Sequence, residues 1–190
     1  MSELASIFPT IIGVYKIDID FDLVYEIIKK YKSEEHIILE NSESSWNQNS
    51  NILFDENLDY LREKMEEYLE KYSSSIGIKP LHIVESWYNE MKKGTKIITH
   101  RHEGSVVSGA FYIRANHESV PLRFMSPLRP YKMNELYERN DTEYSTSGVQ
   151  FKPEIGTLLL FPSWLEHETD PEVGTRCVIS FNTLYKCLFS

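Results

Sequence analysis

The sequence predicts a mainly β protein of the α+β class, in which N-terminal helices support an antiparallel sandwich or barrel. The first eighty residues contain two segments with apolar side chains at helical spacing. From Leu81 onward, short segments rich in β-branched and aromatic residues follow one another. With 190 residues, 41% of them hydrophobic and 13% aromatic, the chain is long and apolar enough to bury a core. We expect residues 1–190 to form one domain.

The two helices are expected to lie in residues 1–80 and to pack on a sheet. The first begins at Asp22, a good N-cap, and has a stripe formed by Val24, Ile27, Ile28 and Tyr31. The second follows Asp55 and has a stripe formed by Leu58, Leu61, Met65, Leu69 and Tyr72. Between them, residues 40–51 are polar and rich in turn formers, which predicts a loop.

Residues 81–190 are expected to form the β core. Seven segments are predicted as strands: 81–90, 95–101, 105–114, 121–125, 149–152, 157–161 and 176–185. The long polar insertion 126–148 interrupts the series. Its length is typical of a functional lid, and its composition suits a disordered segment equally well.

Charge and targeting signals exclude several classes of protein. The net charge is −9 and the 20 basic residues are scattered, which argues against nucleic acid as a partner. The N-terminus lacks the basic and apolar regions of a signal peptide, and no apolar run reaches the roughly 18 residues that span a membrane. Cys177 and Cys187 would lie roughly 30 Å apart on the last strand, too far for a disulfide. We expect a cytoplasmic protein that binds neither nucleic acid nor membranes.

Three histidines are the candidate metal ligands. In a strand, His100 and His102 point to the same side while Arg101 faces away. His167 follows the apolar strand 157–161, which would deliver its ring to the mouth of a barrel. The alternative for the H-x-H pair is two polar surface histidines. The other three histidines are expected to be structural or exposed: His36, His82 and His117.

Arg176 is the candidate anion-binding residue. It begins an otherwise apolar strand, on which Ser180 and Asn182 share its side. A guanidinium with hydroxyl and amide neighbours suits a carboxylate, which it can bind through two parallel hydrogen bonds. The alternative is an ion pair with one of the 29 acidic residues.

The C-terminal half resembles the iron(II)- and 2-oxoglutarate-dependent oxygenases of the prolyl-hydroxylase-like superfamily, and within them a family found in marine bacteria and their phages. The resemblance rests on five motifs that occur in the same order over about half the chain. They are Trp87-Tyr88-Asn89, His100-Arg101-His102, Ser108-Gly109-Ala110-Phe111-Tyr112, Gly156 through Phe161-Pro162-Ser163 to His167, and Arg176 through Ser180-Phe181-Asn182. A phage-encoded protein of this kind would act in the cytoplasm of the host.

The resemblance implies a double-stranded β-helix, or jelly roll, with the N-terminal helices packed on its major sheet. It implies Fe(II) bound at the open end by His100, His102 and His167. Arg176, nine residues after the last of these, would bind the distal carboxylate of 2-oxoglutarate, with help from Ser180 and Tyr112. Further pocket residues would be Trp87, Asn89, Ser108 and Asn182.

The middle ligand departs from the family pattern. Most relatives have Asp or Glu where this chain has His102, which gives two histidines and one carboxylate around the metal. Glu103 would replace it only if a bulge turned that side chain inward, so we expect His102 to bind.

The implied activity is that of a dioxygenase using Fe(II), 2-oxoglutarate and O2 to hydroxylate a protein side chain, for example a prolyl residue, or a small molecule. Two alternatives remain at this point. The sequence also resembles the cupins through Gly94, His100, His102, Gly156, Pro162 and His167, although Trp164 replaces a motif glycine. A cupin would be a three-histidine metal dioxygenase or isomerase that does not use 2-oxoglutarate. The second alternative is a β-helix protein that binds metal without catalysis.

Overall fold

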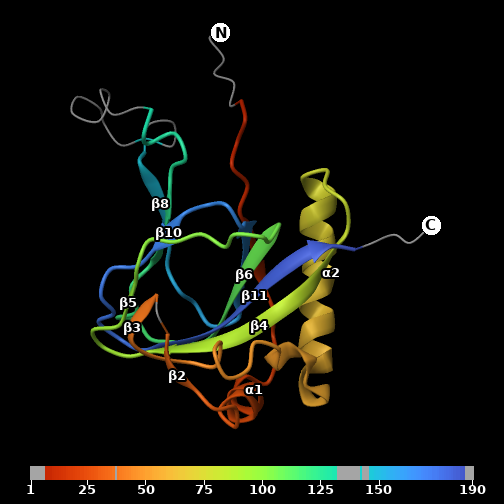
Figure 1. Cartoon of the computed structure of the whole chain (residues 1–190), viewed down its shortest axis with the longest axis vertical. Coiled ribbons are helices and arrows are strands. Elements are labelled where there is room, and N and C mark those ends of the chain that lie inside the picture. Colours follow the sequence, from red (N-terminus) through yellow and green to blue (C-terminus); the bar gives the residue numbers. More distant parts are fainter. Residues whose placement is uncertain (1–6, 37, 132–141, 143–145, 187–190) are drawn as a thin grey trace.

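A computed structural model describes residues 7–36, 38–131, 142 and 146–186 of the chain. Its strands form two antiparallel sheets, and its two α-helices lie together on one side of the larger sheet (Figure 1). This is the mainly β architecture that the sequence predicts, with the helices supporting the major sheet.

The larger sheet has eight strands, of which seven form one continuous path and the eighth, β5 (Lys96–Ile97), pairs with β3. Along the path the strands are β1 (Gly13–Lys16), β9 (Thr157–Pro162), β6 (Val107–Ala115), β11 (Arg176–Tyr185), β4 (Leu81–Met91), β3 (Leu39–Ser44) and β2 (Glu34–His36). The two longest strands, β4 and β11, pair over almost their full length in the middle of the sheet. They therefore form its rigid centre.

The smaller sheet has the order β10 (His167–Glu168), β7 (Leu122–Met125) and β8 (Gly148–Phe151). Beyond β10 it is extended by an isolated antiparallel bridge between His100 and His167. Eight apolar side chains fill the space next to the larger sheet: Ala110, Tyr112, Leu122, Phe124, Leu159, Phe161, Leu165 and Val178. The histidines thus lie at the edge of a packed core.

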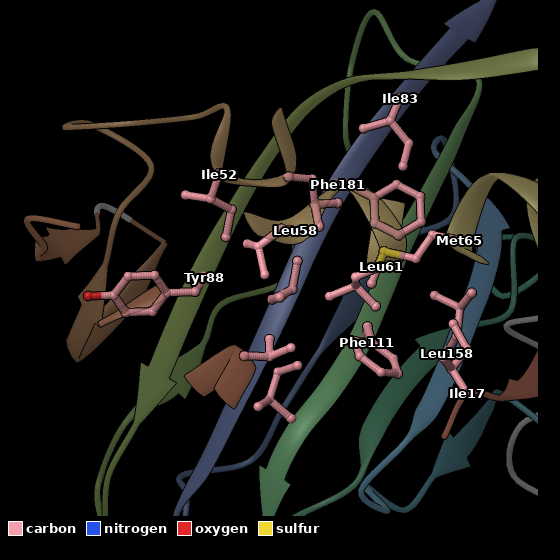
Figure 2. Packing of buried hydrophobic residues seen from close by; sticks show 14 of the residues in the cluster. Ile17, Ile52, Leu58, Leu61, Met65, Ile83, Tyr88, Phe111, Leu158 and Phe181 are labelled. Atoms are coloured by element: carbon pink, nitrogen blue, oxygen red, sulfur yellow. The ribbon is translucent and has the colours of Figure 1, made fainter. Parts of the chain in front are cut away.

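The helices cover the opposite face of the larger sheet. α1 (Phe21–Ile28) buries Val24, Ile27 and Ile28, and α2 (Asp59–Ser75) follows two short 3-10 helices, η1 (Ile52–Phe54) and η2 (Glu56–Leu58). Figure 2 shows the resulting core, to which the helices and the sheet both contribute, for example Leu61, Met65, Phe111, Leu158 and Phe181. This larger cluster is wholly separate from the histidines.

Two details of the helices differ from the prediction. The N-cap of α1 is Asp20, whose side chain accepts a hydrogen bond from the backbone N–H of Leu23 at 2.9 Å, and Asp22 lies in the first turn. The helix ends at Ile28, so Tyr31 lies beyond it. The hydroxyl of Tyr31 donates to the carboxylate of Asp55 at 2.6 Å. This hydrogen bond connects the segment that follows α1 with the segment that precedes α2.

The strand predictions are correct from Leu81 onward to within a few residues, except for 95–101, where only Lys96–Ile97 forms a ladder. The prediction of a loop at 40–51 is wrong for its first half, because β3 pairs there with β4. Glu43 lies opposite Glu90, and Lys29 binds both carboxylates at 3.0 and 2.6 Å. A lysine from α1 thus offsets a repulsive cross-strand pair, which the local sequence cannot reveal.

The region 1–80 contributes β1, β2 and β3 to the larger sheet in addition to its helices. Most of the predicted lid 126–148 falls on residues 132–141 and 143–145, which lie outside the described residues, as does Cys187. Cys177 is a buried free thiol. No helix in the described part of the chain is long and apolar enough to cross a membrane.

Candidate functional site

The three predicted histidines meet at one point between the sheets. The ring of His100 lies 4.2 Å from that of His167, and the ring of His102 lies 5.1 and 5.2 Å from these two, measured between centroids. Each residue offers one ring nitrogen, and these nitrogens all lie within 4.8 Å of one another. A group of three imidazoles converging in this way is suited to a transition metal.

Backbone carbonyls hold two of the rings in the form that a metal requires. Nδ1 of His100 donates to the carbonyl of Ile98 at 2.9 Å, and Nδ1 of His167 donates to the carbonyl of Leu165 at 3.0 Å. Because Nδ1 carries the proton, the lone pair of Nε2 is free to bind an ion. Among the described residues, nothing hydrogen-bonds to the ring of His102, which instead lies near the rings of Trp87 and Phe161.

The same surroundings keep the rings neutral. Burial lowers the pKa of His102 to about 3, with further lowering from His100 and His36. Burial also holds the pKa of His167 well below its usual value and lowers the pKa of His100. Neutral imidazole is the metal-binding form, so the donor set present here fits a divalent metal ion at neutral pH.

Glu103 is not part of this cluster. Its carboxylate accepts two hydrogen bonds from the side chain of Arg101, at 2.9 and 3.2 Å, and its side chain is 79% exposed. The ion pair with Arg101 thus holds the Glu103 side chain in solvent, away from the three histidines.

A cavity lies next to the histidines and opens to solvent. Its wall is mostly apolar, and four polar side chains of the larger sheet line it: Asn89, Tyr112, Arg176 and Ser180. Cross-strand pairing explains their arrangement, because Val178 lies beside both Asn89 and Tyr112, and Ser180 lies beside Trp87. Alternating residues of β4 and β11 therefore face the metal-ligand cluster.

Arg176 is almost completely buried yet incompletely bonded. Its Nη1 donates to the carbonyl of Val120 at 2.9 Å, its Nε contacts the sulfur of Met91 at 3.1 Å, and the same nitrogen lies 3.3 Å from a carboxylate oxygen of Glu172. Its Nη2 has no hydrogen-bond partner, and neither has Oδ1 of Asn89, which lines the same cavity. Buried polar atoms of this kind normally have partners, so they mark a place where a polar ligand fits.

Comparison with known proteins now identifies the chemistry. The family model described as "Putative 2OG-Fe(II) oxygenase", where 2OG is 2-oxoglutarate, matches residues 85–182, just over half of the chain. The chain belongs to this family of 2OG-Fe(II) oxygenases. The matched residues include all five motifs, the three histidines and Arg176. The match therefore decides against the cupin and the non-enzymatic alternatives. No match was found among curated protein sequences.

Solved structures of oxygenases share the fold. HygX from Streptomyces hygroscopicus, with nickel and 2-oxoglutarate bound, has a TM-score of 0.66 at 10% identity, over 94% of this chain and 84% of that one. A prolyl-4-hydroxylase from Pseudomonas putida has a TM-score of 0.62 at 13% identity, over 92% of both chains. The viral collagen prolyl hydroxylase of Paramecium bursaria Chlorella virus-1, in complex with 2-oxoglutarate, has a TM-score of 0.58 at 16% identity, over 91% of this chain and 96% of that one. The oxygenase therefore has the jelly-roll fold that these proteins share.

Fe(II) is the metal and 2-oxoglutarate the cosubstrate of this oxygenase family. Both fit the cavity of this chain. The neutral imidazoles suit the ion, and the unpartnered guanidinium nitrogen of Arg176 suits a carboxylate.

Two predicted pocket residues have another place in the oxygenase. Ser108 and Asn182 do not line the cavity, although Trp87 and Asn89 do. The hydroxyl of Ser108 lies 2.8 Å from that of Ser163 and donates to Asn182 at 2.6 Å, in a network shielded from solvent. Both side chains are directed toward this network and not toward the cavity, and their membership of the substrate pocket stays a prediction.

That network is connected to the backbone of His102, one of the three candidate ligands. The carbonyl of Ser163 accepts a hydrogen bond from the backbone N–H of His102 at 2.9 Å, and the backbone N–H of Ser163 donates to Val106 at 3.1 Å. We define Ser108, Ser163 and Asn182 as the serine latch. Its members come from three of the family motifs. It holds the turn at Ser163, which follows β9, precedes His167 and hydrogen-bonds to the backbone of His102.

Two residues near the site carry no signal in the sequence. His36, expected to be structural or exposed, is buried, and burial together with His100 lowers its pKa. Nδ1 of His36 accepts a hydrogen bond from the backbone N–H of Ile38. The carbonyl of Ile38 accepts one from the backbone N–H of Ile98, and the carbonyl of Ile98 accepts one from the ring of His100. Glu172, the second, lies against Arg176. A buried glutamate in the turn-rich stretch 168–175 resembles a surface residue until the fold is known.

Proposed function

We propose that the protein is an Fe(II)- and 2-oxoglutarate-dependent hydroxylase in which His100, His102 and His167 bind the metal. Arg176, assisted by Ser180 and Tyr112, binds the distal carboxylate of 2-oxoglutarate. The observation that carries the proposal is the presence, in one cavity, of three neutral imidazoles and a buried guanidinium nitrogen without a partner. The imidazoles would bind the metal ion, and the guanidinium would bind the distal carboxylate of 2-oxoglutarate.

The chemistry supplied by bound Fe(II) and 2-oxoglutarate is activation of O2, coupled to decarboxylation of 2-oxoglutarate to succinate and to hydroxylation of a C–H bond. The residues of this chain bind, orient and exclude water. Ile98 and Leu165 keep the Nε2 lone pairs of two histidines directed at the metal. The apolar cavity wall lowers the local dielectric, which strengthens the pairing of Arg176 with a carboxylate.

The hydroxyl of Tyr112 acts as a neutral hydrogen-bond donor in this scheme. Burial raises its pKa, and the nearby Glu172 raises it further against the lowering effect of Arg176. The phenol is therefore protonated at neutral pH and can donate to a carboxylate oxygen. Ser180, which accepts from Asn89 at 3.3 Å, lies four residues after Arg176 on the same strand.

The primary substrate is a protein side chain, such as a prolyl residue, or a small molecule. The similar structures include both kinds of oxygenase, since two are prolyl hydroxylases and one is HygX with hygromycin B bound.

Turnover of 2-oxoglutarate is the direct test of the proposal. Succinate is measured under air, with and without added Fe(II), and we expect iron-dependent succinate formation even in the absence of a primary substrate. His117→Ala, at an exposed turn, is the control and should retain turnover. Absence of succinate from a protein that binds stoichiometric Fe(II) would contradict the proposed activity.

The middle ligand is tested by comparing two neighbouring substitutions. His102→Ala should remove Fe(II) binding in an anaerobic titration, because it deletes one of three ligands. Glu103→Ala should leave binding unchanged, because its carboxylate is paired with Arg101 in solvent. Loss of iron in the Glu103 variant alone would exchange the two assignments.

A further inference from the structure

Glu172 is a buried carboxylate in the loop that precedes β11. Its side chain has no solvent exposure, and one carboxylate oxygen accepts hydrogen bonds from the backbone N–H groups of Val120 and Gly174, at 3.0 and 3.1 Å. The other oxygen lies 3.3 Å from Nε of Arg176 and accepts no hydrogen bond. A buried charge without a partner is costly, and Arg176 is the cation that faces this one.

Glu172 and Arg176 both hydrogen-bond to the backbone of Val120. The backbone N–H of Val120 donates to Glu172, and its carbonyl accepts from Nη1 of Arg176 at 2.9 Å. The sulfur of Met91 lies against Nε, so two of the three guanidinium nitrogens have a partner. Nη2 is left as the nitrogen without a partner, in a side chain that lines the cavity.

The position requires a carboxylate. If a glutamine kept its oxygen toward Val120 and Gly174, its NH2 group would face the guanidinium, and donor would oppose donor. If the amide turned over, its NH2 group would face the two backbone N–H groups instead. Either orientation breaks one half of the arrangement.

We propose that Glu172 is a positioning residue that holds the Arg176 guanidinium so that Nη2 is presented to the distal carboxylate of the cosubstrate, and that it thereby sets the preference for a dicarboxylic 2-oxo acid. The inference rests on the proposed function. Glu172 acts through Arg176 and does not touch the cosubstrate. Its loss should therefore weaken the binding of 2-oxo acids that carry a distal carboxylate and spare those that lack one.

The test compares 2-oxoglutarate with 2-oxobutyrate, which lacks the distal carboxylate. Dissociation constants for both are measured by anaerobic calorimetry on the Fe(II)-loaded protein. We expect Glu172→Gln to reduce the preference for 2-oxoglutarate at least tenfold, the size of a lost charge-assisted hydrogen bond, with the constant for 2-oxobutyrate changed less than about twofold. Arg176→Ala should reduce the preference at least as much, and Glu172→Asp should retain part of it.

Glu90→Gln is the matched control. Glu90 is a largely buried carboxylate of β4 that binds Lys29 and Tyr25 and does not line the cavity. Its loss should lower stability without changing the preference. An unchanged preference in Glu172→Gln, beside a collapsed preference in Arg176→Ala, would overturn the role of Glu172 alone. Failure of the wild-type protein to bind either 2-oxo acid would instead overturn the proposed function.

A second measurement covers the case in which Glu172→Gln does not fold. Breaking a buried ion pair is destabilising, whereas replacing both partners by uncharged groups is much less so. The double variant Glu172→Gln/Arg176→Met should therefore fold and be more stable in urea than Glu172→Gln alone. A double variant no more stable than the single one would show that Glu172 does not act through Arg176.

Discussion

The two faces of β11 are built from alternate residues of one strand and have different tasks. On one face, Cys177, Ile179 and Phe181 pack into the core beneath the helices. On the other, Arg176 and Ser180 line the cavity, and the guanidinium retains a nitrogen without a partner. The helix-facing side is packed with apolar groups, which stabilises the sheet, while the cavity side leaves bonding capacity for a ligand. Substitutions on the two faces should therefore have separable effects.

Removing a metal ligand should have the largest effect, and on the cavity side alone. His167→Ala deletes a buried ring that is held by Leu165, and Fe(II) affinity should fall by more than about a hundredfold, beyond the effect of losing a supporting group. Anaerobic titration measures the affinity, and urea unfolding of the metal-free protein measures the separate cost of truncating a buried ring that lies 4.9 Å from that of Phe161. Stoichiometric iron in this variant would remove the ligand assignment.

Phe181→Ala should break the helix-facing side while sparing the metal. Phe181 is fully buried, and its ring lies so close to Gly109 that a side chain there would meet it at 2.1 Å. Truncation should lower the free energy of unfolding by about 3–5 kcal/mol, measured by urea titration. In the folded protein the Fe(II) dissociation constant should stay within about threefold of wild type. A large loss of iron affinity would mean that the faces are coupled.

Acid should weaken the cavity side selectively. In the unfolded chain the histidines titrate near pH 6.5, whereas burial lowers the pKa of His102 to about 3 and that of His167 well below normal. Between these values the unfolded chain binds more protons, so the stability of the metal-free protein should decrease as the pH falls below 6.5. Each ring contributes about 1.4 kcal/mol per pH unit. Urea unfolding at pH 7.5 and 5.5 measures the mean slope, and His102→Ala should reduce it by about half a proton, because the unfolded histidine is half-protonated at the centre of this range.

A substitution in the serine latch should have the smallest combined effect on stability and on iron affinity. Ser108→Ala removes the hydroxyl shared by Ser163 and Asn182, which should cost about 1–3 kcal/mol of stability. Because the latch supports the backbone of His102, the Fe(II) affinity should fall by up to about tenfold. Ser73→Ala, at a buried serine of α2, is the control and should leave iron affinity unchanged. Equal affinities in both variants would make the latch purely structural.

Much of the fold was readable because it depends on local pattern. The last strand was predicted at its observed bounds, since period-2 alternation and flanking turn residues define it in the sequence. The strands β1, β2 and β3 are not predicted. Their sequences are short or polar, and they are strands because β9 pairs with β1, β4 pairs with β3 and β3 pairs with β2. Pairing of this kind is a property of the tertiary structure.

The residues of the candidate site also fall into two groups, those that local sequence pattern predicts and those that depend on the tertiary structure. The positions of His100, His102, His167 and Arg176 follow from strand periodicity and motif spacing, and the structure brings them to one cavity. Glu172 could not be recognised, because burial of an acidic residue in a loop depends on which segments close over it. Ser108 and Asn182 share motifs with residues that line the cavity, and the alternation along β11 places Asn182 on the same side as Ser180, yet in the structure the two side chains hydrogen-bond to each other and do not line the cavity.

The bridge between His100 and His167 restrains two of the three proposed ligands. The two residues exchange both backbone hydrogen bonds, at 3.1 and 3.0 Å, a ladder geometry with a Cα separation of about 5.5 Å. Hydrogen bonds from Nδ1 to the carbonyls of Ile98 and Leu165 orient the two rings, whereas no described residue hydrogen-bonds to the ring of His102. On the proposed assignment, we expect substitutions around His102 to change metal selectivity most.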